Sequence, residues 1–380
     1  MDMKDCRKAI DEIDGQLIRL ISERMEVASR IAEYKKEHGL PVLDAEREKE
    51  KILSVLESTP DEIKEYTPLL FSLIFELSRS YQNRLIGTGS GLTGEIAESL
   101  ENTPKLFPEN ASVACQGIKG ANSQIACEKL FRYPKTLYFS SFEAVFSAVD
   151  KCLCEYGVIP VENSTAGSVN SVYDLMMQHH FYIVRSIRLK VNHNLLAKPG
   201  VKLEDIREVY SHEQALNQCS IFLNSLNGVR IIPCENTSVA AKKVADSDRN
   251  DIAALASDLC VDYYGLNCLV SSVQNADNNY TRFICISKKL EIYPGADRTS
   301  LMMVLPHRQG SLYRALSRFY ALGINLNKLE SRPLPGKEFE FMFYFDLDAS
   351  VYSKGLIQLI GELPAICERF QYLGSYSEVF

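Results

Sequence analysis

Residues 17–31 read LIRLISERMEVASRI, a stretch that is typical of an amphipathic helix with one charged residue on its apolar face. Apolar or aromatic side chains recur every three or four residues from Ile10 to Tyr34, which is the spacing of a helix seam buried against other helices. Arg24 is the one charged residue in that seam. A charge there costs roughly several kcal/mol unless it meets a partner. The sequence therefore predicts that Arg24 faces an anion.

The helical pattern extends over the first 88 residues. It predicts a helix from Met3 to His38, a second from Ala45 to Ser58 and a third over residues 67–85. Gly39 ends the first of these helices. No segment with the two-residue period of a strand interrupts the region. We therefore expect an all-α domain over residues 1–88.

Further polar residues accompany Arg24. Lys35 follows it by 11 residues, about 20° around an ideal helix and about 16 Å along it, so the two cations could hold a small dianion between them. Arg7 precedes Arg24 by 17 residues, about 25 Å along the axis, and could join the same site only from a second copy of the chain. The second and third helices add Asp44, Arg47, Glu48, Ser78 and Gln82. From spacing alone, surface salt bridges remain the alternative for these residues.

Together these residues resemble the active-site pattern of the helical (AroQ-type) chorismate mutases. The resemblance implies an intertwined homodimer that rearranges chorismate to prephenate. It assigns Arg7 of the other subunit, Arg24 and Arg47 to the carboxylates and polar groups of the substrate. It assigns Lys35 and Gln82 to the ether oxygen, and Glu48 to the hydroxyl group, with Asp44 and Ser78 lining the pocket.

The segment after Ile86 is rich in Gly, Ser and Thr, and we assign residues 89–109 to a linker. Beyond it, short β-branched runs alternate with helical patterns up to residue 288. The runs predict strands over 156–164, 181–191 and 229–234, and helices over 171–180 and 237–247. This alternation favours an α/β domain over 110–288 with a mainly parallel sheet.

Four stretches of this domain carry small hydroxyl or amide residues at expected strand or helix ends: GIKGANSQIA (117–126), PVENSTAGSVNSVYDL (160–175), SHEQALNQC (211–219) and NYTRF (279–283). Such ends suit carboxylate binding, although simple helix capping explains any one of them. Together they resemble prephenate dehydratase, a two-lobed fold similar to periplasmic binding proteins. The resemblance implies conversion of prephenate to phenylpyruvate, with Thr281 as proton or hydrogen-bond donor. Arg282 is an alternative polarising group, and the candidates for positioning the substrate are Asn163, Ser164, Ser211 and Gln214.

The last segment, residues 299–378, shows a strand–helix–strand–strand–helix–strand order, which is the α+β ferredoxin-like arrangement. Its strands are expected over 299–306, 326–334, 339–348 and 372–378, and its helices over 310–323 and 356–370. The segment resembles an ACT domain. Two motifs that bind phenylalanine in such domains correspond to Gly310, Ser311 and Leu312, and to Glu330, Ser331, Arg332 and Pro333. The resemblance implies feedback inhibition; a purely structural dimerisation module is the alternative.

The composition excludes several other classes. A net charge of −7 disfavours nucleic acid as a partner. No run of 18 apolar residues predicts a membrane span, and the charged N-terminus lacks a signal peptide, so we expect a cytoplasmic protein. The 11 cysteines are scattered and form no CxxC pair, so we expect neither a disulfide framework nor a metal site. We also expect no organic cofactor. A non-catalytic amino-acid sensor, or a dehydratase with a vestigial mutase, remain the rival functions.

Overall fold

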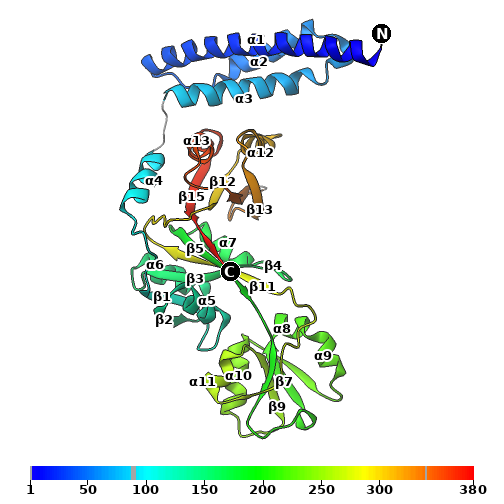
Figure 1. The fold of residues 1–380 in the computed structure, drawn as a ribbon, viewed down its shortest axis with the longest axis vertical. Helices are drawn as coiled ribbons and strands as arrows, with labels where there is room; N and C mark the ends of the chain where they lie inside the picture. The colour runs from blue at the N-terminus through cyan, green and yellow to red at the C-terminus, as the bar shows by residue number, and fades with distance from the viewer. Residues whose placement is uncertain (1, 87–90, 339) are drawn as a thin grey trace. The chain divides into compact units, whose positions relative to one another are not determined.

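The computed structural model describes residues 2–86, 91–338 and 340–380. The chain divides into two compact units (Figure 1). One comprises the chain up to Glu95 together with Ile357–Ile366, and the other comprises Ile96–Leu356 with Cys367–Phe380. Within the described residues, no helix is both long enough and apolar enough to cross a membrane.

The first unit contains the three expected helices: α1 (Met3–Glu37), α2 (Ala45–Ser58) and α3 (Thr67–Ile86), with a single 3₁₀ turn at Asp61–Ile63. The predicted bounds are confirmed to within one residue. Asp2 and Asp5 cap the start of α1 reciprocally, each carboxylate accepting the backbone N–H of the other residue at 3.1 and 3.2 Å. Asp44 caps α2 by accepting the Arg47 N–H at 3.0 Å. These caps explain why both helices begin where they do.

The apolar seam of α1 is only partly covered by the residues that the structure describes. Its side chains remain substantially exposed, from 42% at Ile31 to 56% at Ile10. Among the described residues of α1, only Ala28 and Ala32 are buried. The helices of the described single chain therefore bury this seam only in part, and burial against further helices stays a prediction.

The predicted linker contains a helix. Residues 91–102 form α4 (Gly91–Asn102), whereas residues 89 and 90 lie outside the described ranges. Ile96 is fully buried, and the Ser99 hydroxyl donates to the carbonyl of Leu290 at 3.0 Å. Thr103 Oγ1 accepts the backbone N–H of Ile292 at 3.0 Å. The second half of the predicted linker is therefore part of the second unit's fold.

The second unit begins with a lobe built on a seven-stranded sheet (Figure 1). The strand order is β16-β5-β11-β3-β1-β2, with β4 paired to β3. The strands are β1 (Asn110–Gln116), β2 (Tyr133–Phe139), β3 (Tyr156–Asn163), β4 (Gly167–Ser168), β5 (Tyr182–Lys190), β11 (Tyr280–Ser287) and β16 (Glu378–Val379). The helices of this lobe are α5 (Asn122–Leu130), α6 (Phe142–Asp150) and α7 (Asn170–Met176).

A second lobe is inserted between β5 and β11. Its five-stranded sheet has the order β10-β6-β9-β7-β8, with strands β6 (Asn194–Ala197), β7 (Glu208–His212), β8 (Arg230–Cys234), β9 (Ile252–Ala256) and β10 (Asn267–Val270). Its helices are α8 (Glu213–Gln218), α9 (Ser220–Ser225), α10 (Thr237–Asp246) and α11 (Leu259–Tyr264), with a 3₁₀ turn at Leu203–Asp205. Both sheets are mixed, because β11 runs antiparallel to β3 and β5, and β6 runs antiparallel to β9 and β10. The α/β class is confirmed, but the mainly parallel sheet is not.

The C-terminal subdomain, residues 298–376, follows the predicted element order. It contains β12 (Arg298–Val304), α12 (Ser311–Ala321), β13 (Asn325–Pro333), β14 (Phe341–Asp348), α13 (Lys354–Glu362), a 3₁₀ turn at Leu363–Ile366 and β15 (Arg369–Tyr376). The sheet is antiparallel throughout, in the order β13-β14-β12-β15. The last predicted helix ends earlier than expected, since β15 already starts at Arg369, and Phe339, the first residue of one predicted strand, is not among the described residues.

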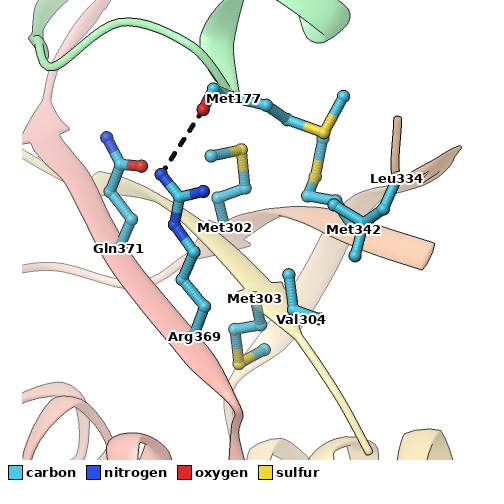
Figure 2. A pocket seen from close by; sticks show the side chains of 8 residues that line it. All are labelled: Met177, Met302, Met303, Val304, Leu334, Met342, Arg369 and Gln371. Carbon is cyan, nitrogen blue, oxygen red and sulfur yellow. Dashed lines mark hydrogen bonds between the residues drawn. The ribbon is translucent and has the colours of Figure 1, made fainter. Parts of the chain in front are cut away.

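One face of this sheet packs on the first lobe. Met302, Met342 and Tyr344 share a buried core with Tyr173 and Met176 of α7. Figure 2 shows the edge of this contact, where methionines from both sides meet and the Arg369 guanidinium donates to the carbonyl of Met177 at 3.4 Å.

β15 also lies directly against β5. Gly374 has a φ of +134°, and a Cβ there would lie 2.3 Å from the carbonyl oxygen of Ile183. Only glycine fits this approach. Beyond β15 the chain crosses to the first lobe, where β16 pairs in parallel with β5. The last residues of the chain therefore complete the sheet of the first lobe.

Candidate active sites

Arg24 lies on α1 beside α3 with an incompletely satisfied guanidinium. Its carbon Cζ is 5.8 Å from the centre of the Phe75 ring, and its buried Nη1 has no hydrogen-bond partner among the described residues. Burial lowers the pKa of Arg24, and the nearby Glu48 carboxylate opposes that shift. A partly buried cation with a spare donor is suited to binding an anionic ligand.

The neighbouring part of α3 carries two buried polar residues. Gln82 Nε2 donates to Ser78 Oγ at 3.4 Å, and Gln82 Oε1 has no partner within the part of the chain that the structure describes. Arg79, which sequence reasoning missed, forms an ion pair with Glu48 and thereby fixes α2 against α3. The structure thus brings Arg24 near Glu48 and places Ser78 and Gln82 on α3, the helix whose Phe75 lies beside Arg24.

The other predicted residues of this region are placed differently. Lys35 Nζ donates to the carbonyl of Val42 at 2.6 Å, and the Asp44 carboxylate is used as the α2 cap. Arg47 is exposed and pairs with Glu50 at 3.2 Å. Arg7 is exposed near the start of α1. In the single chain these four residues do not join Arg24.

A second site lies between the two lobes, in a cavity of about 370 Å³. The residues that line it come from both lobes and include Gly117, Asn122, Ser123, Asn163, Thr281 and Phe283 on one side and His193, His212, Gln214, Gln218, Asn236, Thr237 and Ser238 on the other. None of the described lining residues is Lys or Arg. The starts of α5 and α10 both reach the cavity, and the positive end of a helix favours anions, although Asn236 caps α10 by accepting the Val239 N–H at 2.8 Å and the Glu235 carboxylate also lines the cavity.

Thr281 is held in this cavity by Asn163. Asn163 Nδ2 donates to Thr281 Oγ1 at 2.9 Å and to Asn279 Oδ1 at 2.8 Å. Asn163 Oδ1 in turn accepts the Thr165 hydroxyl at 2.7 Å and the Ala166 N–H at 2.9 Å, which fixes the orientation of the amide. Because Thr281 Oγ1 accepts a hydrogen bond, its own proton is directed away from Asn163 and is free for a ligand.

Gln218 and His193 extend this network into the second lobe. Gln218 Oε1 accepts from Asn279 Nδ2 at 3.0 Å and lies 2.9 Å from His193 Nε2, which therefore carries the proton. His193 is buried, and its Nδ1 has no partner among the described residues. Burial lowers the pKa of His193, with the Gln218 bond opposing the shift, so the ring is neutral at pH 7. Sequence reasoning missed both residues, although Gln218 follows the predicted Gln214 by one helical turn.

Comparison with known proteins identifies the family. Residues 6–83 match the model of chorismate mutase type II, and residues 113–291 match that of prephenate dehydratase. A bifunctional chorismate mutase/prephenate dehydratase of Aquifex aeolicus is 30% identical over 377 residues, which cover 99% of this chain and 98% of the relative. The chain belongs to the bifunctional chorismate mutase/prephenate dehydratase family. Its helical unit is thus the mutase domain, and its two lobes form the dehydratase domain.

Other relatives match about 70% of this chain. Arogenate dehydratase/prephenate dehydratase 1 of Arabidopsis thaliana is 38% identical over 281 residues, covering 70% of this chain and 71% of the relative. A prephenate dehydratase from Arthrobacter aurescens, solved in complex with L-Phe, is 25% identical with a TM-score of 0.65, over 70% of this chain and 90% of that one. GqqA, described as a quorum quenching acylase, is 30% identical with a TM-score of 0.64, over 70% of this chain and 97% of that one.

Several predicted dehydratase residues have other tasks. Ser211 is fully buried and donates to the carbonyl of Leu255 at 2.7 Å, and Ser164 Oγ accepts the Tyr280 N–H at 2.9 Å. Neither lines the cavity. Gln214 does line it, and His212 both lines it and caps α8 by accepting the Gln214 N–H at 3.3 Å. The substrate-positioning role expected of Ser164 and Ser211 is therefore replaced by a structural one.

Arg282 does not reach the cavity. It is only 7% exposed and lies on the face of β11 opposite to Thr281, because neighbouring residues of a strand point to opposite faces. Its guanidinium pairs with Asp346 and Glu378 instead. The expectation that Arg282 polarises the substrate hydroxyl is therefore wrong.

The predicted effector residues lie on α12 and β13. Gly310 has a φ of +80° and ends the loop before α12, and the buried Ser311 hydroxyl has no hydrogen-bond partner in the described chain. On β13, Glu330 accepts from Ser168 and Arg332 pairs with Asp174 at 2.8 Å, so both point at the dehydratase domain. Ser331 points to the other face. Leu312 follows Ser311 on α12, and Pro333 ends β13.

Proposed function

We propose that this chain catalyses two consecutive reactions of phenylalanine biosynthesis and is inhibited by phenylalanine. The mutase domain rearranges chorismate to prephenate, and the dehydratase domain converts prephenate to phenylpyruvate, carbon dioxide and water. The observation that carries the proposal is that each domain has a hydrogen-bond donor without an acceptor among the residues that the structure describes. These donors are Arg24 Nη1 in the mutase domain and the hydroxyl of Thr281, whose oxygen accepts from Asn163, in the dehydratase domain.

The mutase reaction suits a cage of cations. It is unimolecular and needs the substrate held in a folded conformer, with charge stabilised at the ether oxygen as its bond to carbon breaks. We assign Arg24, Arg47 and the second subunit's copy of Arg7 to the carboxylates and polar groups of chorismate. Lys35 and Gln82 bind the ether oxygen, Glu48 binds the hydroxyl group, and Asp44 and Ser78 line the pocket. Lys35 exchanges its bond to Val42 for the substrate on binding.

A homodimer brings Arg7 to this site. The exposed apolar stripe on α1 supports it, because an unpartnered stripe of this length is stabilised by a second copy of the same helix. The distance along α1 between Arg7 and Arg24 supports it too, since about 25 Å is too far for one small ligand.

Subunit mixing tests the shared site. Arg7→Ala and Arg24→Ala should each be inactive as mutases, but co-refolded at equal amounts they should recover about a quarter of the wild-type rate. Half of the dimers are then mixed, and one of the two sites in each mixed dimer has both arginines intact. The measurement is prephenate formation from chorismate. A mixture no more active than its two parents would show that Arg7 acts within its own chain.

In the dehydratase reaction, the carboxylate leaves as carbon dioxide, its bonding electrons complete the aromatic ring, and the ring hydroxyl departs. We assign Thr281 as the donor of a hydrogen bond to that leaving hydroxyl. Asn163 orients Thr281, and Gln214 contributes to substrate positioning. The starts of α5 and α10 suit the substrate carboxylates in a cavity that lacks lining cations among its described residues. Prephenate is the expected substrate because the mutase domain produces it.

For the C-terminal subdomain we infer an ACT domain of ferredoxin-like fold that binds phenylalanine. The strand order β13-β14-β12-β15 supports the fold. The binding residues are Gly310, Ser311, Leu312, Glu330, Ser331, Arg332 and Pro333. Glu330 and Arg332 already contact the dehydratase domain, so a ligand that changes their contacts shifts the balance between states of that domain.

One assay tests the whole proposal. Purified protein is given chorismate, and prephenate and phenylpyruvate are followed with and without phenylalanine. We expect phenylpyruvate to form and phenylalanine to slow its formation. Prephenate that accumulates without further conversion would contradict the dehydratase assignment. Binding of phenylalanine without any turnover would favour an amino-acid sensor instead.

A further inference from the structure

Arg282 is the centre of a buried polar cluster between the dehydratase domain and the C-terminal subdomain, which we call the Arg282 cluster: Arg282, Asp346, Tyr376 and Glu378. The guanidinium forms an ion pair with Asp346 on β14, donates to the Tyr376 hydroxyl at 2.8 Å and lies 3.0 Å from Glu378 Oε1. Burial alone would lower the pKa of Arg282, but Tyr376 and Asp346 reverse this and raise it. The guanidinium is therefore fully charged, and it is neutralised by Asp346 of the C-terminal subdomain and by Glu378, which the end of the chain brings to the same sheet as Arg282.

Asp346 is held as firmly as Arg282. It is 3% exposed, and it accepts hydrogen bonds from the Tyr344 hydroxyl at 2.6 Å and from the Ser300 hydroxyl. Burial would raise the pKa of Asp346, but Arg282 and these hydroxyls outweigh it, so the pKa lies below its ordinary value. Arg282 Nε lacks a hydrogen bond among the described residues, but both other nitrogens of the guanidinium donate, and a buried pair bonded in this way favours one geometry.

Glu378 adds a second anchor from the end of the chain. Its carboxylate is 1% exposed and lies within 2.8 to 3.4 Å of nitrogens from Arg188, Arg282 and Arg298. The pairing of β16 with β5 places it there, one strand away from β11 in the sheet. The residues matched by the prephenate dehydratase model end at 291, so both anionic anchors of Arg282 lie outside that match.

The cluster lies directly behind the candidate catalytic hydroxyl. Arg282 follows Thr281 on β11, and Thr281 pairs with Asn163 of β3. The pairing of β11 with β5 is regular from Tyr280 to Cys285, but the register between β11 and β3, the strand that carries Asn163, shifts immediately after Arg282. A strand residue clamped on one face fixes the position of its neighbour on the other face.

We propose that Arg282 is a positioning residue for the dehydratase reaction, through which Asp346 and Glu378 of the C-terminal segment hold the Thr281 hydroxyl in place. The proposal rests on the proposed role of Thr281. It assigns a task in the dehydratase reaction to residues that lie more than 60 positions from Thr281 in the sequence. It also gives a function to Arg282, whose side chain points away from the cavity although its neighbours Thr281 and Phe283 line it.

The test uses full-length Asp346→Asn, with Asp251→Asn as the control for the same chemical change. Asp251 also pairs with an arginine, at 2.8 Å to Arg249 Nε, but that pair lies in the second lobe and does not line the cavity or touch β11. Without phenylalanine, Asp346→Asn should lower dehydratase kcat by about tenfold to thirtyfold with KM changed by less than about twofold, because a small displacement of a reacting group has an effect of this order. Asp251→Asn should leave kcat within about twofold, and the mutase rate of every variant serves as an internal standard.

A double-mutant cycle separates positioning from general destabilisation. In a Thr281→Ala background, Asp346→Asn should cause no further loss, because the group that it positions is already absent. The same fold-loss in both backgrounds, or an Asp346→Asn protein as active as Asp251→Asn, would overturn the proposal. Should Asp346→Asn fail to fold, Tyr376→Phe removes the hydroxyl that accepts a hydrogen bond from the same guanidinium. It should lower kcat by about threefold when Thr281 is present and cause no further loss in Thr281→Ala. A Thr281→Ala protein with wild-type activity would instead refute the role of Thr281 itself.

Discussion

Arg24→Ala should lower the chorismate mutase kcat/KM by about 10²- to 10⁴-fold and leave dehydratase activity within about twofold. Truncating one partner of a partly buried, charge-assisted contact removes roughly 3–5 kcal/mol, which corresponds to about 10² to 10⁴ in rate. Arg24 supplies such a contact, since its Nη1 is buried and unpaired in the described chain. The dehydratase cavity lies in the other compact unit and contains no part of α1.

Prephenate formation from chorismate and phenylpyruvate formation from added prephenate measure the two activities separately. Arg19→Ala is the matched control on the same helix, because Arg19 is exposed and pairs only weakly with Glu23 at 3.8 Å. Arg24→Lys keeps the charge but loses the forked donors, so it should recover only part of the rate. Loss of both activities in Arg24→Ala, with the far-UV circular dichroism unchanged, would show that the two sites are not independent.

The helices of the mutase domain were predictable because their signal is local. Periodicity and caps such as Asp44 define α1, α2 and α3 within a few residues of sequence. Strand direction was not predictable in the same way. Whether β11 pairs parallel or antiparallel depends on partners at least 90 residues away, and a composition rich in Gly and Ser hid the helix α4.

The same distinction applies to the sites. Arg24 was found because a charge interrupted a local apolar pattern. Arg79 and Gln218 were missed because their partners, Glu48 and His193, come from other elements. The role expected of Arg282 conflicts with the two-residue period of a strand, which already places its side chain on the face opposite to Thr281. What no local pattern could indicate is the pair of carboxylates that neutralise it.

Thr281→Ala should have the reverse effect of Arg24→Ala: dehydratase kcat falls by about 10² to 10³ while mutase activity is retained. A positioned proton or hydrogen-bond donor contributes about 10² to 10⁴ to a rate. Asn163 Nδ2 would also lose one of its acceptors, although Asn279 still accepts from it, so the fold should be preserved.

Two substitutions at this position isolate the hydroxyl from the shape of the side chain. Thr281→Ser keeps a hydroxyl that can accept from Asn163 and should retain kcat within about tenfold. Thr281→Val keeps the branched shape but has no oxygen, and it should be as inactive as Thr281→Ala. The measurement is phenylpyruvate formation from prephenate at saturating substrate. A Thr281→Val protein as active as Thr281→Ser would show that Thr281 fills space in the cavity, and the leaving hydroxyl would then need a donor elsewhere among the lining residues.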